Sequence, residues 1–256
     1  MKFIILGCGS SMGVPRPDGD FGKCNPKNKK NYRSRCSALI KSKNETALID
    51  TSPDLRYQLI KNNIKIIDKV FYSHMHADQT HGINDLRVFF LKKNKTIPVY
   101  ADLPTRKYLI NTFRYCFVNN SREYPATLKL NSINSNMFIM NGLKKIKIKP
   151  LKVKHGKVDS ICYIIDKKIA YISDVSHIAK KNYKFLKNLN FLVIDCLWLR
   201  SHPSHLNLES SLKLIKLLNP KKAILTNLHS DLDYEILKKK LPKNVRPAYD
   251  GLEIEL

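Results

Sequence analysis

Phe71-Tyr-Ser-His-Met-His-Ala-Asp-Gln-Thr-His-Gly82 is the stretch that decides the fold and the chemistry of this chain of 256 residues. His74 and His76 are two residues apart, and side chains two apart on an extended segment project to the same side. Two imidazoles from one short loop can therefore bind one metal ion, and Asp78 offers a hard oxygen ligand for a second ion. An isolated His-x-His is weak by itself, so the prediction depends on further ligands elsewhere in the chain.

Further candidate ligands follow one pattern, in which a short apolar strand ends at a histidine or an aspartate. The four residues are His155 after Leu151–Lys154, Asp174 after Ile169–Ser173, Asp195 after Phe191–Ile194, and His229 after Ala223–Leu228. A rigid sheet holds groups at its strand ends in place yet leaves them open to a substrate. Each residue alone has an ordinary explanation as a strand terminator or a core histidine. Together with the His74 motif they predict a metal site.

Length and composition indicate an ordinary globular protein with a substantial core. Hydrophobic residues make up 43% of the chain, with 9 Gly and 12 Pro, which does not suit a disordered or fibrous chain. The first apolar run, Phe3–Leu6, is too short for a signal peptide, and no run approaches the roughly 20 apolar residues that span a bilayer. We expect a soluble, cytoplasmic protein with no membrane partner. The six cysteines form no Cys-x-x-Cys pair, which favours free, buried thiols.

The formal net charge of +25 raises the question of nucleic-acid binding. The excess is mostly lysine and is spread along the chain, as in Lys144–Lys154 and Lys238–Lys243. Neither run is interleaved with aromatic residues that would stack on bases. A solvated basic surface is therefore the preferred interpretation, and nucleic acid stays the second choice. A positive field would still attract anionic substrates of any size.

The elements expected from hydrophobic periodicity form a mixed series of strands and helices. A long irregular segment, Gly7 to Arg35, follows the first strand, and loops of this length are usually functional. Alternating residues predict a meander of strands from Ala126 to Val153. The main expected helices are Pro53–Asn62, Ile83–Phe90, Thr105–Tyr115, Ile178–Leu186, Leu208–Leu218 and Tyr234–Lys240.

The chain resembles the metallo-β-lactamase superfamily. The resemblance spans nearly the whole chain and is carried by the metal loop, His155, Asp174, His229, Gly7-Cys-Gly-Ser-Ser-Met-Gly-Val-Pro15, Leu48-Ile-Asp-Thr-Ser52 and His202-Pro-Ser-His205. It implies an α+β fold, a four-layer αβ/βα sandwich, and a single domain over residues 1–256. The most similar branch contains the phosphoribosyl cyclic phosphate phosphodiesterases, and the tRNA 3′-processing endonucleases are more distant.

The resemblance also implies roles for individual residues. It makes His74, His76 and His155 ligands of a first divalent ion, Zn or Mn, with Asp174 bridging to a second ion. Asp78 and His229 would serve that second ion. Asp50 would be a carboxylate that orients the metal loop, and Asp195 receives only a structural role.

One position departs from the pattern of the superfamily, since Gln79 stands where most members have a histidine for the second metal. A neutral amide is a poorer ligand than imidazole, so the second site would bind weakly, take a water, or prefer a harder ion such as Mn²⁺. His81 is a possible substitute, although a contact within the loop or with a group that orients a metal ligand suits it better. Only Cys24 stands in the loop where some relatives bind a structural zinc, so we do not predict that site.

The implied reaction is hydrolysis of a phosphodiester by a metal-bound hydroxide. Two divalent ions about 3.5–4 Å apart can hold a hydroxide between them and clamp the attacked and leaving oxygens. Asp78 would orient this nucleophile, and His205 would donate a proton to the leaving oxygen. Capping of the next helix is the alternative role for His205. The candidate substrate contacts are Ser10, Ser11, Arg16 and Arg87.

The most specific substrate that the resemblance implies is phosphoribosyl 1,2-cyclic phosphate. A tRNA 3′-processing nuclease is the first alternative, which the positive charge favours and the lack of an evident basic, glycine-rich arm disfavours. A metal-binding or nucleic-acid-binding module impaired at Gln79 is the second alternative, although the retained His205 argues against it. β-Lactam and thioester hydrolysis share the fold, which alone does not choose the chemistry. The sequence does not decide whether the protein forms a homodimer.

Overall fold

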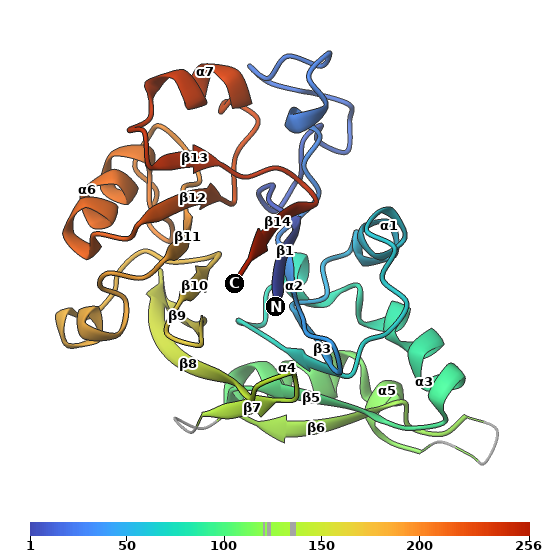
Figure 1. Cartoon of the computed structure of the whole chain (residues 1–256). Coiled ribbons are helices and arrows are strands. Elements are labelled where there is room, and N and C mark those ends of the chain that lie inside the picture. Colours follow the sequence, from blue (N-terminus) through green and yellow to red (C-terminus); the bar gives the residue numbers. More distant parts are fainter. Residues whose placement is uncertain (120, 122–123, 134–136) are drawn as a thin grey trace.

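A computed structural model describes residues 1–119, 121, 124–133 and 137–256 and contains two seven-stranded sheets (Figure 1). The first sheet has the order β14-β1-β2-β3-β4-β5-β6 and the second has the order β13-β12-β11-β10-β9-β8-β7. The strands of the first sheet are β1 (Lys2–Gly7), β2 (Ser37–Lys41), β3 (Thr46–Ile49), β4 (Lys69–Phe71), β5 (Ile97–Ala101), β6 (Leu128–Ser132) and β14 (Leu252–Glu255). Those of the second are β7 (Phe138–Met140), β8 (Ile146–His155), β9 (Val158–Ile165), β10 (Ile169–Ile172), β11 (Phe191–Asp195), β12 (Lys222–Thr226) and β13 (Val245–Pro247).

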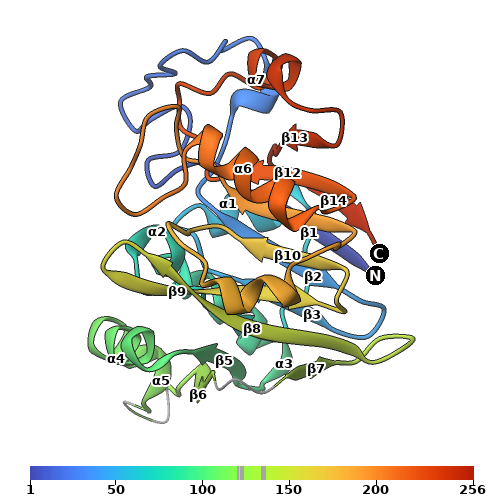
Figure 2. The same ribbon diagram turned by 90° about the vertical axis from the view of Figure 1, so that its left-hand side faces the viewer.

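Helices cover the outer face of each sheet (Figures 1 and 2). Those beside the first sheet are α1 (Leu55–Lys61), α2 (Ala77–Thr80), α3 (Arg87–Lys93), α4 (Leu103–Thr112) and α5 (Arg114–Phe117). Those beside the second are α6 (Leu208–Leu218) and α7 (Tyr234–Lys240). Short 3₁₀ helices span η1 (Lys29–Asn31), η2 (Ile83–Leu86) and η3 (Lys180–Phe185). Among the described residues, no helix is long and apolar enough to cross a membrane.

Three apolar clusters hold these layers together. Side chains alternate between the two faces of a strand, so Phe3 and Ile5 of β1 face the second sheet while Ile4 and Leu6 face the helices. The central cluster joins the sheets through residues such as Phe71 of β4 and Tyr163 of β9. The outer clusters lie beneath α1, α3 and α4 on one side and beneath α6 and α7 on the other. The predicted four-layer α+β sandwich is confirmed, and the single domain over residues 1–256 stays a prediction.

The predicted meander over residues 126–153 is wrong in its pairing. β6 pairs in parallel with β5 of the first sheet, whereas β7 and β8 begin the second sheet as an antiparallel pair. Residues 134–136 of this segment lie outside the described residues. An alternating pattern indicates a strand but not the strand with which it pairs. The pattern therefore does not show that the chain passes from the first sheet to the second between β6 and β7.

Two of the predicted helices differ from those in the structure. The helix expected over 105–115 divides into α4 and α5, because Phe113 leaves the helical region with φ −125° and ψ 38°. The helix expected near 178–186 is the shorter 3₁₀ helix η3. Helix α6 has the predicted bounds, and Asn207 caps it by accepting a hydrogen bond from the Ser210 backbone N–H at 2.9 Å.

Asp250, between β13 and β14, anchors the long loop of residues 7–35. Its Oδ1 accepts hydrogen bonds from the Cys8 backbone N–H at 3.1 Å and the Cys8 thiol at 3.4 Å. Its Oδ2 accepts them from the backbone N–H and the hydroxyl of Ser34, at 2.7 and 2.6 Å. One carboxylate therefore fixes both ends of a loop that has little regular structure of its own.

We expect Asp250→Ala to lower the free energy of unfolding by about 1–3 kcal/mol, because buried N–H groups at both ends of the loop lose their acceptor. Urea denaturation followed by circular dichroism measures the change. Asp18→Ala, at an exposed position of the same loop, is the control and should shift stability by no more than about 0.5 kcal/mol. Equal effects of the two substitutions would contradict the anchoring role.

Candidate metal centre

The loop that follows β4 is fixed from both sheets. The Ser73 backbone N–H donates to Asp50 Oδ1 at 2.7 Å, and Asp50 adopts the left-handed φ of 62°. From the second sheet, the Ile161 N–H donates to the Ser73 carbonyl at 2.9 Å and the Tyr163 hydroxyl donates to the Tyr72 carbonyl at 2.6 Å. The backbone before His74 is therefore held in place, and Asp50 has the orienting position expected of it.

Three imidazoles converge at this loop. His74 Nε2 lies 2.9 Å from His76 Nδ1, which lies 3.2 Å from Nε2 of His155 at the end of β8. The edge of a tetrahedral zinc site with nitrogen ligands measures about 3.3 Å. The three ligand atoms all lie within 4.8 Å of one another. This geometry fits a single divalent ion bound by three histidines.

Neighbouring groups fix the orientation of two of these rings. His155 Nδ1 donates to the Ser204 carbonyl at 2.7 Å, because a carbonyl oxygen only accepts, and His74 Nδ1 lies 3.0 Å from the Ser73 hydroxyl. The other nitrogen of each ring is thereby left for the ion. Burial lowers the pKa of His74 to about 3 and also lowers the pKa of His155, so both rings are neutral and have a free lone pair.

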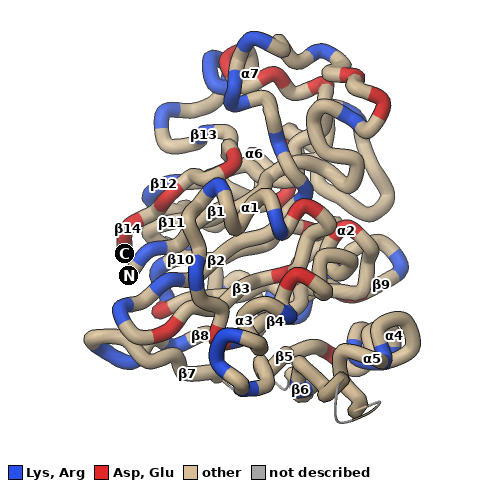
Figure 3. Tube along the Cα trace, turned by 90° about the vertical axis from the view of Figure 1, so that its right-hand side faces the viewer, with Lys and Arg blue, Asp and Glu red and all other residues tan. Residues whose placement is uncertain are grey.

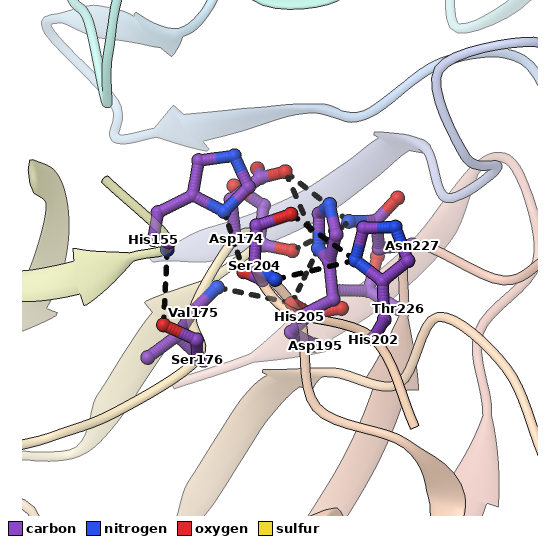
Figure 4. Close-up of polar contacts among 12 residues, drawn as sticks. His155, Asp174, Val175, Ser176, Asp195, His202, Ser204, His205, Thr226 and Asn227 are labelled. Carbon is purple, nitrogen blue, oxygen red and sulfur yellow. Dashed lines mark hydrogen bonds and ion pairs between the residues drawn. The ribbon is translucent and has the colours of Figure 1, made fainter. Parts of the chain in front are cut away.

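Asp174, two residues after β10, joins the three histidines to the rest of the site. A second group of ligand atoms within 4.8 Å of one another consists of His155, Asp174 and His205. Asp174 Oδ1 accepts a hydrogen bond from Asn227 Nδ2 at 3.2 Å, and Oδ2 accepts one from Gln79 Nε2 at 3.3 Å (Figure 4 shows the Asn227 side). Both oxygens therefore have amide donors. Asp78 lies in the first turn of α2. Its burial is the largest cause that raises the pKa of Asp78 to about 6, and the charge of Asp174 is the next largest.

His205 and Asp195 form a buried pair beside the cluster (Figure 4). His205 Nδ1 lies 2.8 Å from Asp195 Oδ2, which also accepts a hydrogen bond from the Val175 N–H at 3.0 Å. Burial alone would lower the pKa of His205, but the hydrogen bond and the charge of Asp195 raise it to about 9. The rings of His205 and His155 have centroids 4.6 Å apart. His205 does not cap α6, since Asn207 is the cap, and Asp195 does more than the structural role expected of it.

The structure places His229 apart from these groups. Its Nε2 lies 3.3 Å from Arg16 Nη2, and its ring stacks on Trp198 with centroids 4.8 Å apart. Among the described residues, neither group of mutually close ligand atoms includes His229. The residue that contacts Asp174 from this segment is Asn227. The expectation gave His229 to a second ion, and the structure does not bring it into either group of ligand atoms.

The other candidate residues lie at different distances from the centre. His81 Nε2 lies 2.8 Å from the hydroxyl of Tyr108, which belongs to α4 and not to the metal loop. Ser10 is buried, and its N–H donates to the Leu228 carbonyl at 3.3 Å, so the first loop reaches the end of β12. The Ser11 carbonyl accepts from Arg35 Nε at 3.0 Å. Arg87 is exposed at the start of α3, and no described contact joins it to the centre.

The sequence did not single out Asn227, and it singled out Asp195 but gave it only a structural role. β12 ends at Thr226, so Asn227 is the first residue after the strand and satisfies the same rule as Asp174 better than His229 does. His229 was chosen as the candidate ligand because histidine is a common metal ligand. The position directly after the strand, however, belongs to Asn227. Asp195 itself followed the rule, but its partner comes ten residues later in an irregular loop.

The fold and the three-histidine cluster together define a class of metal-dependent hydrolases. Residues 45–227 match the model of the beta-lactamase superfamily domain, so the chain belongs to this superfamily, and the predicted superfamily is confirmed. It is similar to a structure described as a new diphosphatase from the PhnP family, with 29% identity, a TM-score of 0.90 and coverage of 100% of this chain and 97% of that one. Zinc-bound PqqB from Methylobacterium extorquens has the same fold at 15% identity, with a TM-score of 0.78 and full coverage of both chains.

Among curated proteins, an octanoyltransferase of Porphyromonas gingivalis is 31% identical over 99% of this chain but only 51% of its own length. A ribonuclease Z of Prochlorococcus marinus is 24% identical over 49% of this chain and 41% of its own length. The chain thus spans about half the length of the curated relatives it matches. The activity in each name belongs to the longer protein.

We expect His74→Ala combined with His76→Ala to abolish metal binding, because only one imidazole of the cluster would remain. His229→Ala should retain the metal content of the wild type, since His229 contacts Arg16 and Trp198 instead. Elemental analysis of the purified variants by mass spectrometry measures both. Loss of metal from His229→Ala, or full occupancy of the double variant, would contradict the assignment.

Proposed function

We propose that this protein is a metal-dependent phosphodiesterase that hydrolyses a small cyclic or ester phosphate, most concretely phosphoribosyl 1,2-cyclic phosphate. The observation that carries the proposal is the His205–Asp195 pair, which lies directly against the three-histidine cluster. It combines a metal site with a proton donor for a leaving alkoxide. The likeness to a PhnP-family diphosphatase over nearly the full length of both chains supports the same reading.

His74, His76 and His155 would hold the ion. A divalent ion bound there supplies Lewis acidity toward a phosphoryl oxygen and lowers the pKa of a coordinated water. Asp78 lies in the first turn of α2, two residues after His76, and is close enough to Asp174 for their charges to interact. We assign Asp78 the role of orienting the attacking water toward the phosphorus.

His205 would donate a proton to the leaving oxygen. Its Nδ1 faces Asp195, so Nε2 is the nitrogen left to face a substrate. Asp195 has no other charged contact among the described residues and is wholly buried. Its part is to hold the ring in one orientation and to stabilise the charged imidazolium, as a buried carboxylate does for a catalytic histidine in general.

The charge of the molecule supports an anionic substrate without selecting a polymer. Figure 3 shows basic residues distributed over many elements of one side of the molecule, and they do not gather into a single stripe. Strand β8 leads to His155 and has two lysines on its second half, Lys152 and Lys154, which both pair with Asp159. A long basic track beside the centre is therefore partly neutralised, which favours a small substrate.

A nuclease of the ribonuclease Z type is the second candidate. The similarity to ribonuclease Z over about half the chain and the net charge of +25 favour it. A catalytically impaired binding module is disfavoured, because the His205–Asp195 pair is intact. The buried, free cysteines suit a reducing compartment, so we propose the cytoplasm as the location.

A side-by-side assay separates these functions. With Mn²⁺ or Zn²⁺ present, we expect turnover of phosphoribosyl 1,2-cyclic phosphate and bis(p-nitrophenyl) phosphate, and little turnover of a thioester or a precursor tRNA. The reason is that the centre combines a candidate metal site with a proton donor suited to a leaving alkoxide, and that Lys152 and Lys154 beside it are paired with Asp159. Preferred cleavage of the precursor tRNA would select the nuclease, and activity on the thioester alone would remove the phosphodiesterase proposal.

His205→Ala should lower kcat by about 10²–10⁴-fold, the usual contribution of a general acid, while metal content stays unchanged. Asp195→Asn should lower kcat in the same direction, since an amide neither stabilises nor orients a charged imidazole as a carboxylate does. His202→Ala, in the same loop and exposed, is the matched control and should retain most of its turnover. If His205→Ala and His202→Ala gave equal turnover, His205 would have no part in the reaction.

A further inference from the structure

We propose that this chain binds one catalytic divalent ion, and that the amides of Gln79 and Asn227 replace the ligands of a second ion around Asp174. The superfamily resemblance implied two ions, with Asp174 bridging them. The amide N–H groups found around Asp174 are hydrogen-bond donors, and they do not fit as ligands of the second ion. The proposal concerns the metal centre alone and does not depend on the identity of the substrate.

Gln79 occupies the position beside Asp174 where a second ion would need a ligand. Its side chain is 0% exposed, and Nε2 donates to Asp174 Oδ2 at 3.3 Å. Its backbone carbonyl accepts from the Thr51 N–H at 2.8 Å, so the residue is held at both ends. A carboxylate oxygen accepts only from the amide nitrogen, and that nitrogen has no lone pair to offer a metal.

Asn227 does the same for the other oxygen of Asp174. It is 3% exposed, its φ is 60°, and it is the first residue after β12. Asparagine is one of the few residues that adopt this left-handed conformation readily. Nδ2 donates to Asp174 Oδ1 at 3.2 Å and to the Ser173 carbonyl at 3.1 Å (Figure 4). Because two acceptors share Nδ2, the nitrogen and not the oxygen of this amide faces the carboxylate.

Among the described residues, the other imidazoles that could serve a second ion have different partners. His81 bonds the Tyr108 hydroxyl, His229 lies against Arg16, and Nδ1 of His205 faces Asp195. Among the described residues, a second ion would be left with the carboxylates of Asp78 and Asp174 and with two amides that must reverse their orientation. Reversal would break both hydrogen bonds to Asp174 and the one to Ser173. Zinc prefers nitrogen or sulfur ligands to such a set.

The amide pair also explains how Asp174 is kept in place with one ion present. A bridging carboxylate needs a second positive partner to fix its outer oxygen. Here each oxygen has an N–H donor, and such donors hold a carboxylate in its ionised form. Gln79 and Asn227 are thus positioning residues for a carboxylate that belongs to the first ion.

Metal stoichiometry of the wild-type chain tests the proposal directly. Protein stripped with a chelator, loaded with excess Mn²⁺ and passed through gel filtration should retain one Mn²⁺ per chain by elemental analysis. Its electron paramagnetic resonance spectrum should show isolated Mn²⁺. Retention of two Mn²⁺ per chain with the spectrum of a spin-coupled pair would overturn the proposal, whatever the activity of the loaded protein.

Two pairs of substitutions test the role of the amides. Gln79→His with Asn227→His supplies imidazole ligands, and Gln79→Glu with Asn227→Asp supplies carboxylates of almost unchanged shape. Each double variant should retain two Mn²⁺ per chain and give the coupled spectrum. His81→Ala with His229→Ala is the control and should stay at one. Circular dichroism establishes which variants are folded, and a folded double variant that still retains one ion would contradict the exclusion by Gln79 and Asn227.

Discussion

The centre depends on the hydrogen bonds by which one sheet holds the metal loop of the other. β9 of the second sheet supplies Ile161 and Tyr163, which bond the backbone carbonyls of Ser73 and Tyr72 at the end of the first sheet. β9 is also the antiparallel partner of β8, which ends at His155. One strand therefore sets the distance between His155 and the other two histidines. The site forms only where the two sheets are packed against each other.

This dependence explains which parts of the site the sequence revealed. The rule of a strand that ends at a histidine or aspartate singled out His155, Asp174 and the metal loop, and the structure brings these residues together, since strand ends meet along one edge of a sandwich. The rule failed at β12, where Asn227 with its left-handed φ of 60° turns the chain. After that turn His229 points to Arg16 and not to the carboxylate. Residue type alone does not reveal such a turn.

The fold was predictable to a similar degree, and the errors in predicting it have a related cause. Apolar periodicity located most strands, and α6 had both a strong amphipathic pattern and a capping residue. The partner of a strand is decided by contacts distant in sequence, which is why the predicted meander joined β6 to the strands after it and not to β5. The same limit applies to the contact between Asp195 and His205. A local pattern predicts where a group lies on its element, and the packing of the elements decides what it meets.

The electrostatics of Asp174 connect the amide pair to the proton donor. His205 Nδ1 lies 4.0 Å from Asp174 Oδ1, on the side where Asn227 donates its hydrogen bond. A second divalent ion at that side would repel the imidazolium form of His205, since like charges interact strongly in a buried site. Two neutral amides hold the carboxylate without such repulsion. A centre that pairs one ion with a charged histidine is thus internally consistent, because the positive charge near Asp174 is carried by the group proposed to deliver the proton.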